Sequence, residues 1–141
     1  MQEKDIFARV KALGFPIDQY VLIGGALEVY DIRKANDLDF VATPELFAKL
    51  KSEGWKDCDC IYCQKGFKKM LRSEEVDILS EYSVDNTFII PTDQLLKNSS
   101  IINGVRVVSL VDLMNWKKAA GRPKDLADVE LISKFLADKK S

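Results

Sequence analysis

Two aspartates separated by one residue, Asp37 and Asp39, are the side chains in this sequence best suited to chemistry. They alternate with Leu38 and Phe40 in a segment, residues 37–42, whose composition is typical of a β-strand. Side chains two apart on a strand share a face, so both carboxylates would point one way while Leu38 and Phe40 point into a core. Such a pair can converge on a divalent cation, which prefers oxygen ligands. The alternative is an acidic, solvated edge strand.

A glycine pair precedes the aspartates. Gly24 and Gly25 end the run Tyr20–Ile23, which is rich in β-branched and aromatic residues. A strand that turns straight into a helix leaves unpaired backbone N–H groups at the helix start, and these groups attract phosphate. Glycine lets a phosphate approach closely because it has no Cβ. The pattern therefore suits a nucleoside triphosphate with Mg²⁺, with an ordinary turn as the alternative.

The spacing of these motifs resembles a known family. Gly24-Gly25, eleven residues, then Asp37-Leu38-Asp39-Phe40 is similar to the Gly-Gly/Ser…Asp-x-Asp signature of the DNA polymerase beta-like nucleotidyltransferase superfamily. The members that it most resembles are small stand-alone bacterial proteins, including those of the abortive-infection and toxin–antitoxin type. The resemblance implies an α/β (α+β) nucleotidyltransferase fold, a mixed β-sheet flanked by helices. At 141 residues, we expect residues 1–141 to form a single domain.

Two later segments extend the resemblance, which spans Tyr20 to about Ile132. In EEVDILSEY, Asp77 fits the place of the family's third catalytic carboxylate. KKAAGRPKDLADVELI matches the family's C-terminal segment, a Lys-bearing helix followed by Arg-x-Lys-Asp and an acidic position three residues on. By this resemblance, Lys117 lies close to the nucleotide phosphates.

The resemblance also implies an activity and a set of roles. The activity is Mg²⁺- or Mn²⁺-dependent transfer of a nucleoside monophosphate from a nucleoside triphosphate to a hydroxyl acceptor. The catalytic and metal-binding residues would be Asp37, Asp39 and Asp77. The nucleotide would be bound by Gly24, Gly25, Arg33, Lys117 and Arg122.

Structural explanations compete with these roles. Lys117 could be a surface lysine whose stem packs on the protein, and Arg33 and Lys34 could be ordinary loop charges. Arg122, Lys124, Asp125 and Asp128 could form a structural cluster, with Asp125 as a helix cap and the others as surface ion pairs. We favour a structural role for Asp125 and Asp128.

The composition narrows the chemistry further. The absence of histidine excludes Ser-His-Asp and Cys-His catalysis and imidazole metal sites. A fourth metal ligand is missing beside Cys58, Cys60 and Cys63, so we expect reduced thiols there and not a zinc site. The net charge of −1 gives no overall field that would attract nucleic acid. No apolar run reaches the length of a membrane span, so we expect a cytoplasmic protein.

Two other functions are compatible with the same residues. One is a binding module of nucleotidyltransferase fold, such as one half of a toxin–antitoxin pair with a protein partner. The shortness of the chain favours it, because no separate helical domain would hold an acceptor. The other is Mg²⁺-dependent phosphodiester hydrolysis, which leaves the glycine pair unexplained. For nucleotidyl transfer, the acceptor hydroxyl could belong to a protein, an RNA end or a small molecule.

A predicted hairpin positions the third aspartate. Residues 66–72 and 75–81 would be its strands, joined at Ser73-Glu74, and it would bring Asp77 beside the strand of Asp39. The first strand is part of a basic strip, which fits a solvated face better than a contact with triphosphate or a polyanionic acceptor. The strip consists of Lys65, Lys68, Lys69 and Arg72.

Caps and apolar spacing predict the helices around this site. They are residues 4–13 ended by Gly14, a helix capped by Thr43 and begun by Pro44, residues 93–97 capped by Thr92, residues 110–120 capped by Ser109 and ended by Gly121, and a final helix capped by Asp125. Asn103-Gly104 predicts a tight hairpin turn. The buried stripe of the final helix is expected to be Leu126, Val129, Ile132 and Leu136, with Phe135 near it.

Overall fold

The computed structural model describes residues 5–35, 38–57, 70–73, 76–84 and 88–140 of the chain. Asp37 and the three cysteines lie outside these residues, as do Lys65, Lys68 and Lys69. Predictions that concern them therefore stay predictions.

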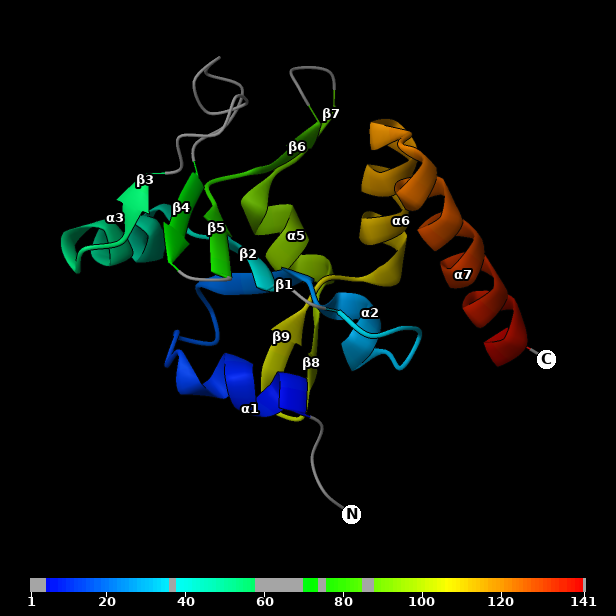
Figure 1. Cartoon of the computed structure of the whole chain (residues 1–141), viewed down its shortest axis with the longest axis horizontal. Coiled ribbons are helices and arrows are strands. Elements are labelled where there is room, and N and C mark those ends of the chain that lie inside the picture. Colours follow the sequence, from blue (N-terminus) through cyan, green and yellow to red (C-terminus); the bar gives the residue numbers. More distant parts are fainter. Residues whose placement is uncertain (1–4, 36–37, 58–69, 74–75, 85–87, 141) are drawn as a thin grey trace.

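A mixed β-sheet forms the centre of the described structure (Figure 1). Its seven strands run in the order β3 (Lys56–Asp57), β4 (Met70–Ser73), β5 (Val76–Leu79), β2 (Leu38–Ala42), β1 (Tyr20–Gly24), β9 (Val105–Val107) and β8 (Ser100–Ile102). The pairs β1–β9 and β2–β5 are parallel, whereas β1–β2, β3–β4, β4–β5 and β8–β9 are antiparallel. A two-stranded antiparallel sheet, β6 (Tyr82–Val84) with β7 (Phe88–Ile90), lies against helix α6.

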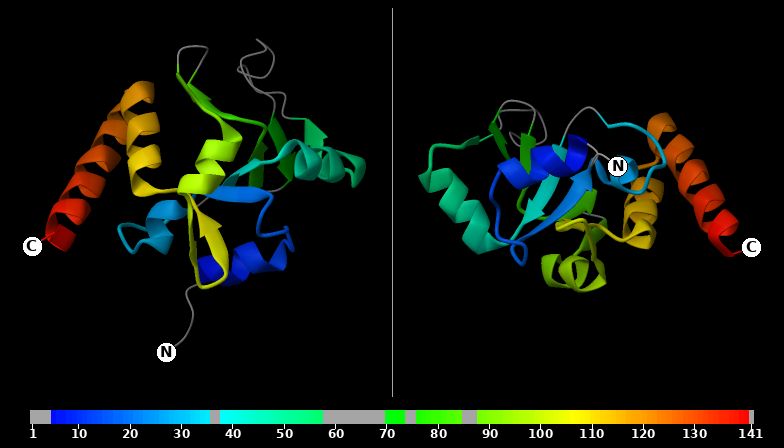
Figure 2. Two further views of the ribbon diagram at one scale, coloured as in Figure 1. Left: turned by 180° about the vertical axis from the view of Figure 1, so that it is seen from behind. Right: turned by 90° about the horizontal axis from the view of Figure 1, so that it is seen from below.

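Helices surround the sheet. They are α1 (Asp5–Ala12), α2 (Ala26–Val29), α3 (Pro44–Ser52), α5 (Thr92–Asn98), α6 (Leu110–Ala120) and α7 (Pro123–Lys140). Helices α1 and α5 lie on opposite sides of the sheet, and α6 and α7 pack together at the end of the molecule away from α3 (Figure 2). The predicted fold class, α/β (α+β) with a mixed β-sheet flanked by helices, is confirmed. No helix in the described part of the chain is long and apolar enough to cross a membrane.

The central strands are anchored by apolar side chains. On β2, Leu38 is 2% and Phe40 0% exposed while Asp39 between them is half-buried, which confirms the predicted alternation. Phe40 meets the rings of Phe15 and Tyr20 edge to face, with centroids 5.3 and 5.6 Å away. Aromatic contacts of this geometry add to the burial energy, so the strand that carries Asp39 is held firmly.

Most of the predicted turn and cap chemistry is confirmed. Asn103 and Gly104 both have positive φ, 49° and 80°, in the turn between β8 and β9. Ser109 accepts a hydrogen bond from the Asp112 N–H at 3.1 Å and caps α6, which ends at Gly121 with φ 67°. Thr43 caps α3 by accepting from the Leu46 N–H at 3.3 Å.

Three predictions near helix starts were wrong. Thr92 is the first residue of α5 and Pro91 occupies the cap, without a side-chain hydrogen bond. Helix α7 begins at Pro123, so Asp125 lies within its first turn and does not cap it. Leu126 is 49% exposed and the inward face of α7 carries Asp125 and Asp128, whereas Ile132 is buried as predicted. The helix is turned this way because the two buried carboxylates have basic partners at the cavity, described below.

Two tyrosine hydroxyls differ in their hydrogen bonding. Tyr30 donates to the Val108 carbonyl at 3.0 Å. The Tyr82 side chain is 1% exposed and stacks on Trp116 with a centroid distance of 5.2 Å, yet its hydroxyl has no hydrogen-bond partner among the described residues. Burial, and then the nearby charge of Asp112, raises the pKa of Tyr82 well above its usual value.

We expect the two hydroxyls to respond oppositely to removal. Tyr30→Phe should lower the free energy of unfolding by about 1 kcal/mol, because it deletes a hydrogen bond that is made. Tyr82→Phe should leave that free energy unchanged or raise it, because a buried hydroxyl without a partner costs free energy. Urea unfolding of both variants measures the difference. An equal loss in both would mean that a water satisfies the Tyr82 hydroxyl.

Candidate active site

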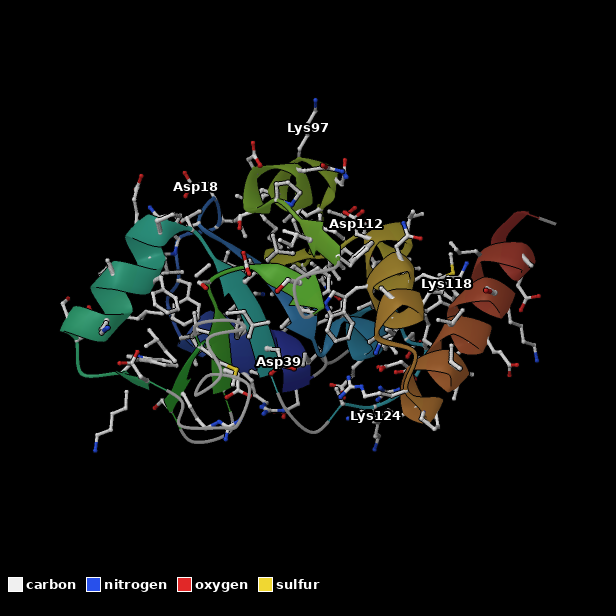
Figure 3. All side chains as sticks on the ribbon, turned by 90° about the horizontal axis from the view of Figure 1, so that it is seen from above. Asp18, Asp39, Lys97, Asp112, Lys118 and Lys124 are labelled. Atoms are coloured by element: carbon white, nitrogen blue, oxygen red, sulfur yellow. The ribbon has the colours of Figure 1, made fainter. Side chains whose placement is uncertain are left out.

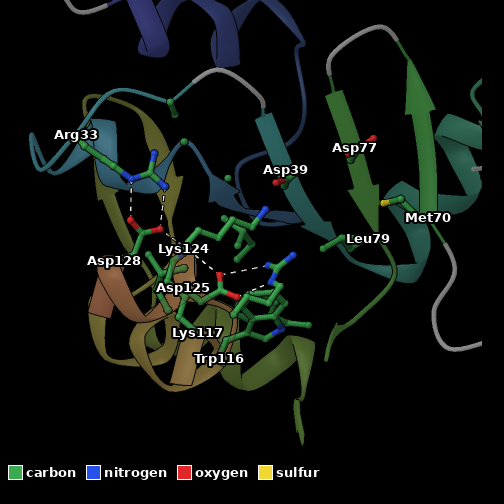
Figure 4. A pocket seen from close by; sticks show the side chains of 17 residues that line it. Arg33, Asp39, Met70, Asp77, Leu79, Trp116, Lys117, Lys124, Asp125 and Asp128 are labelled. Carbon is green, nitrogen blue, oxygen red and sulfur yellow. Dashed lines mark hydrogen bonds and ion pairs between the residues drawn. The ribbon is translucent and has the colours of Figure 1, made fainter. Parts of the chain in front are cut away.

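One row of register partners crosses the sheet and contains the candidate site residues. Gly24 on β1 pairs with Asp39 on β2, and Asp39 pairs with Asp77 on the parallel strand β5. Register partners share a face of the sheet and lie about 5 Å apart, the spacing of neighbouring strands. Figure 4 shows Asp39 and Asp77 on adjacent strands at the edge of a cavity. The two carboxylates are therefore close enough to share a divalent cation.

The two glycines have separate structural explanations. A Cβ on Gly24 would overlap the Asp39 carboxylate, with its Cγ only 2.7 Å away. Gly25 has φ 107°, and a Cβ there would meet Ile6 at 3.0 Å and Leu38 at 3.2 Å in the core. Gly24 thus makes room for Asp39, while Gly25 provides the turn into α2 and the close packing beneath it. Phosphate binding by this turn stays a prediction.

A cavity of about 500 Å³ collects the predicted residues that the structure describes. The sheet side contributes Gly24, Gly25, Asp39 and Asp77, and the opposite side contributes Arg33, Trp116, Lys117, Arg122, Lys124, Asp125 and Asp128. Figure 3, seen from above, shows Asp39 on the central sheet and Lys124 near the start of α7. Arg33 and Asp128 on that opposite side are 95 residues apart in the sequence, so distant segments meet at this cavity.

Asp128 holds two cations on the side of the cavity opposite the sheet. We call this side the helix wall; it consists of Arg33, Trp116, Lys117, Arg122, Lys124, Asp125 and Asp128. It accepts hydrogen bonds from Arg33 Nε at 2.9 Å and Arg33 Nη2 at 2.8 Å, and from Lys117 Nζ at 2.9 Å. Burial would raise the pKa of Asp128, but the hydrogen bonds from Arg33 and then Lys117 outweigh it, and the pKa lies below its usual value. The same hydrogen bond raises the pKa of Arg33. The cations are thereby held in place at the cavity.

Asp125 plays the same part for Arg122. Its two carboxylate oxygens accept from Arg122 Nε and, at 3.2 Å, from Nη2, and Lys117 Nζ lies 3.8 Å from Oδ1. The Arg122 guanidinium carbon is 5.8 Å from the centre of the Trp116 ring, whose Nε1 donates to the Ser83 carbonyl at 2.9 Å. Asp125 is 1% and Asp128 5% exposed, so the expectation of a surface ion pair was wrong for Asp128. Both are buried partners of the cations.

The net charge of the helix wall is positive. Arg33, Lys117 and Arg122 contribute three positive charges, and Asp125 and Asp128 two negative charges, which leaves +1. Exposed Lys124, which also lines the cavity, brings this to +2. The cavity therefore has carboxylates on the sheet and excess positive charge on the wall opposite, as Figure 4 shows.

Arg72 contacts the site in a way that was not predicted. Its Nε lies 2.6 Å from Asp77 Oδ1 and its Nη2 3.2 Å from Oδ2, and the two residues are register partners on β4 and β5. The predicted turn at Ser73-Glu74 was wrong in its bounds, since Ser73 still belongs to β4 and pairs with Val76 on β5. With the observed register, Arg72 and Asp77 face each other directly. The sequence contains both residues of this ion pair, but their pairing could be predicted only with the correct turn position.

The side chains that line the sheet side of the cavity are of a type that binds a magnesium ion. Asp39 and Asp77 supply carboxylate oxygens, the ligands that Mg²⁺ and Mn²⁺ prefer. Within the described ranges there is no cluster of three acidic, histidine or cysteine side chains that could hold a metal. The third predicted ligand, Asp37, lies outside those ranges.

Comparisons with known proteins complete the description. No protein-family model matches the sequence, and a search of curated proteins finds no match. Among solved structures, the chain is similar to the crystal structure of ANT(2")-Ia in complex with adenylyl-2"-tobramycin. The sequences are 16% identical, the alignment covers 96% of this chain and 87% of that chain, and the TM-score is 0.48. A similarity at this level assigns neither a family nor an activity to the chain.

Proposed function

We propose that this protein is a nucleotidyltransferase that moves a nucleoside monophosphate from a nucleoside triphosphate to a hydroxyl acceptor, with Mg²⁺ or Mn²⁺ as its metal ion. The observation that carries the proposal is the polarity of the cavity. Asp39 and Asp77 line one side, and the cations paired with Asp125 and Asp128 line the other. A metal-bound triphosphate needs both, because the metal requires oxygen ligands and the phosphates require positive charge.

Each group has a definite task in this proposal. Asp39 and Asp77, with Asp37, would hold the metal, which when bound neutralises the triphosphate and stabilises the attacking and leaving oxygens. Lys117 and Arg122 would orient the outer phosphates and balance the charge that builds on departing pyrophosphate.

Proton transfer falls to Asp77. It would accept the proton of the acceptor hydroxyl as that oxygen bonds to the α-phosphorus and the bond from the α-phosphorus to the bridging oxygen breaks. In the free protein, the Arg72 guanidinium donates to both Asp77 oxygens and holds that carboxylate. The acceptor is a hydroxyl compound, namely a protein, an RNA end or a small molecule.

Removal of the metal tests the proposal directly. The protein would be incubated with each α-labelled nucleoside triphosphate and candidate acceptors in Mg²⁺ or Mn²⁺, and in parallel with excess EDTA. We expect label transfer and pyrophosphate release with metal and at least a 100-fold lower rate with EDTA, since the metal supplies several kcal/mol of charge stabilisation. Release of nucleoside monophosphate from nucleic acid, without transfer, would indicate hydrolysis instead.

A binding module with little or no catalysis is the second candidate. It is favoured by the ion pairs at the site, because Arg33, Lys117 and Arg122 each have a carboxylate partner already. Such a module, for example one subunit of a toxin–antitoxin pair, would bind a protein partner in a fixed ratio. Co-purification of that partner with both the native protein and Asp39→Asn, in the absence of transfer activity, would support this function.

A further inference from the structure

The row of register partners continues beyond the two carboxylates. Lys56 on β3 pairs with Arg72 on β4, Arg72 with Asp77 on β5, and Asp77 with Asp39 on β2. Positive charge thus lies on one flank of Asp77 and negative charge on the other. Asp77 lies between them, so it can interact with Arg72 on one side and with a cation bound beside Asp39 on the other.

Arg72 engages the oxygens that a metal would need. Both Asp77 oxygens receive a hydrogen bond from the guanidinium, at 2.6 and 3.2 Å. Each oxygen has lone pairs left, but a divalent cation bound there would lie close to the guanidinium, and like charges at short range repel. Cation and Arg72 therefore compete for Asp77.

The Arg72–Asp77 ion pair is exposed enough for Arg72 to exchange Asp77 for another anion. The Arg72 side chain is 53% exposed, against 18% for Asp77. Solvent screens a pair of this kind, so its contribution is small and its guanidinium can move to another anion. A triphosphate brought in with the metal supplies such anionic oxygens next to Asp77.

We propose that Arg72 couples metal binding to nucleotide binding. In the free protein, Arg72 holds Asp77 and weakens the binding of a bare divalent cation. When the cation arrives together with a triphosphate, phosphate oxygens take over the guanidinium and Asp77 is released to the metal. Arg72 is a positioning residue in this scheme, and the inference rests on the proposed function.

The test measures metal binding and not activity. Mn²⁺ affinity would be determined by electron paramagnetic resonance of the free ion, and affinity for tripolyphosphate saturated with Mn²⁺ by calorimetry, for the native protein and Arg72→Ala. We expect Arg72→Ala to bind Mn²⁺ alone about three- to fivefold more tightly, the scale of an exposed ion pair. It should bind the Mn²⁺–tripolyphosphate complex no more tightly than the native protein does. The coupling between the two ligands then shrinks.

Matched variants separate this pair from a general charge effect. Lys56→Ala removes a positive charge from the neighbouring strand without releasing Asp77, and should change the Mn²⁺ affinity by less than twofold. Arg72→Lys keeps the charge but loses the two-point contact, and should lie between Arg72→Ala and the native protein. Equal effects of Lys56→Ala and Arg72→Ala would overturn the proposal.

The outcomes also distinguish the inference from the proposed function. If the native protein binds Mn²⁺–tripolyphosphate and Arg72→Ala leaves the affinity for Mn²⁺ alone unchanged or weaker, the coupling role is wrong while the proposed function stands. If neither protein binds Mn²⁺ or its tripolyphosphate complex, both are wrong.

Discussion

Replacing Asp39 with asparagine should lower the rate of the proposed nucleotidyl transfer by about 100-fold or more, because the proposed metal site would lose a charged ligand. Asparagine has nearly the same shape, so it still fits over Gly24, where a Cβ would overlap the native carboxylate. The register that places residue 39 beside Asp77 is set by the backbone and is kept. The measurement is pyrophosphate release with an α-labelled triphosphate under saturating Mg²⁺.

Asp18→Asn is the matched control for this experiment. Asp18 is an exposed aspartate in the segment before β1, far from the cavity lining (Figure 3). The same change of charge there should leave the rate within about twofold, since surface substitutions away from special features have small effects. If Asp39→Asn keeps more than half of the native rate, this carboxylate has no part in the chemistry.

Removing Asp128 should give the largest loss of stability. Asp128→Ala should lower the free energy of unfolding by about 3 kcal/mol, because it leaves Arg33 and Lys117 beside an apolar methyl group in place of their shared anion. The lower end of the range for buried pairs applies because the Arg33 side chain is 44% exposed and water can reach it. Chemical denaturation measures the change, and Glu130→Ala on the exposed face of α7 should shift it by no more than about 0.5 kcal/mol.

The dependence on pH provides a further check on Asp128. Its pKa is lowered in the folded protein, because hydrogen bonds from Arg33 and Lys117 overcome the effect of burial. The ionised form therefore contributes stability that is fully present above the pKa of the unfolded chain, about 4, and is lost as the pH falls through the folded value. The difference between native protein and Asp128→Ala should shrink in acid. A difference that does not change with pH would contradict the assigned ion pairs.

Local chemistry made much of the fold predictable. Turns and caps depend on contacts between residues close in the sequence, so the local sequence was enough to predict those at Asn103-Gly104, Ser109 and Gly121. The alternation around Asp39 was readable for the same reason, because a strand with one apolar face fixes the direction of every side chain.

The helix wall could not be predicted in the same way. Apolar spacing marked Leu126 as buried, yet α7 turns Asp125 and Asp128 inward and leaves Leu126 49% exposed. The reason is a partner far away in the sequence, since Arg33 lies 95 residues from Asp128. A periodicity analysis treats carboxylates as solvated, and only tertiary structure shows which of them are buried beside a counter-ion.

The close approach of Gly24 and Asp39 makes the residues allowed at positions 24 and 39 depend on each other. Because the Asp39 carboxylate fills the volume that a Cβ at position 24 would need, a larger residue at 24 fits only with a smaller one at 39. Libraries screened for folding alone should therefore yield paired changes, with alanine at 24 accompanied by glycine at 39, because even the Cβ at 39 would lie 2.9 Å from a Cβ at 24. Gly25 should resist exchange in any such library, because its φ of 107° and its contacts with Ile6 and Leu38 do not involve the acid.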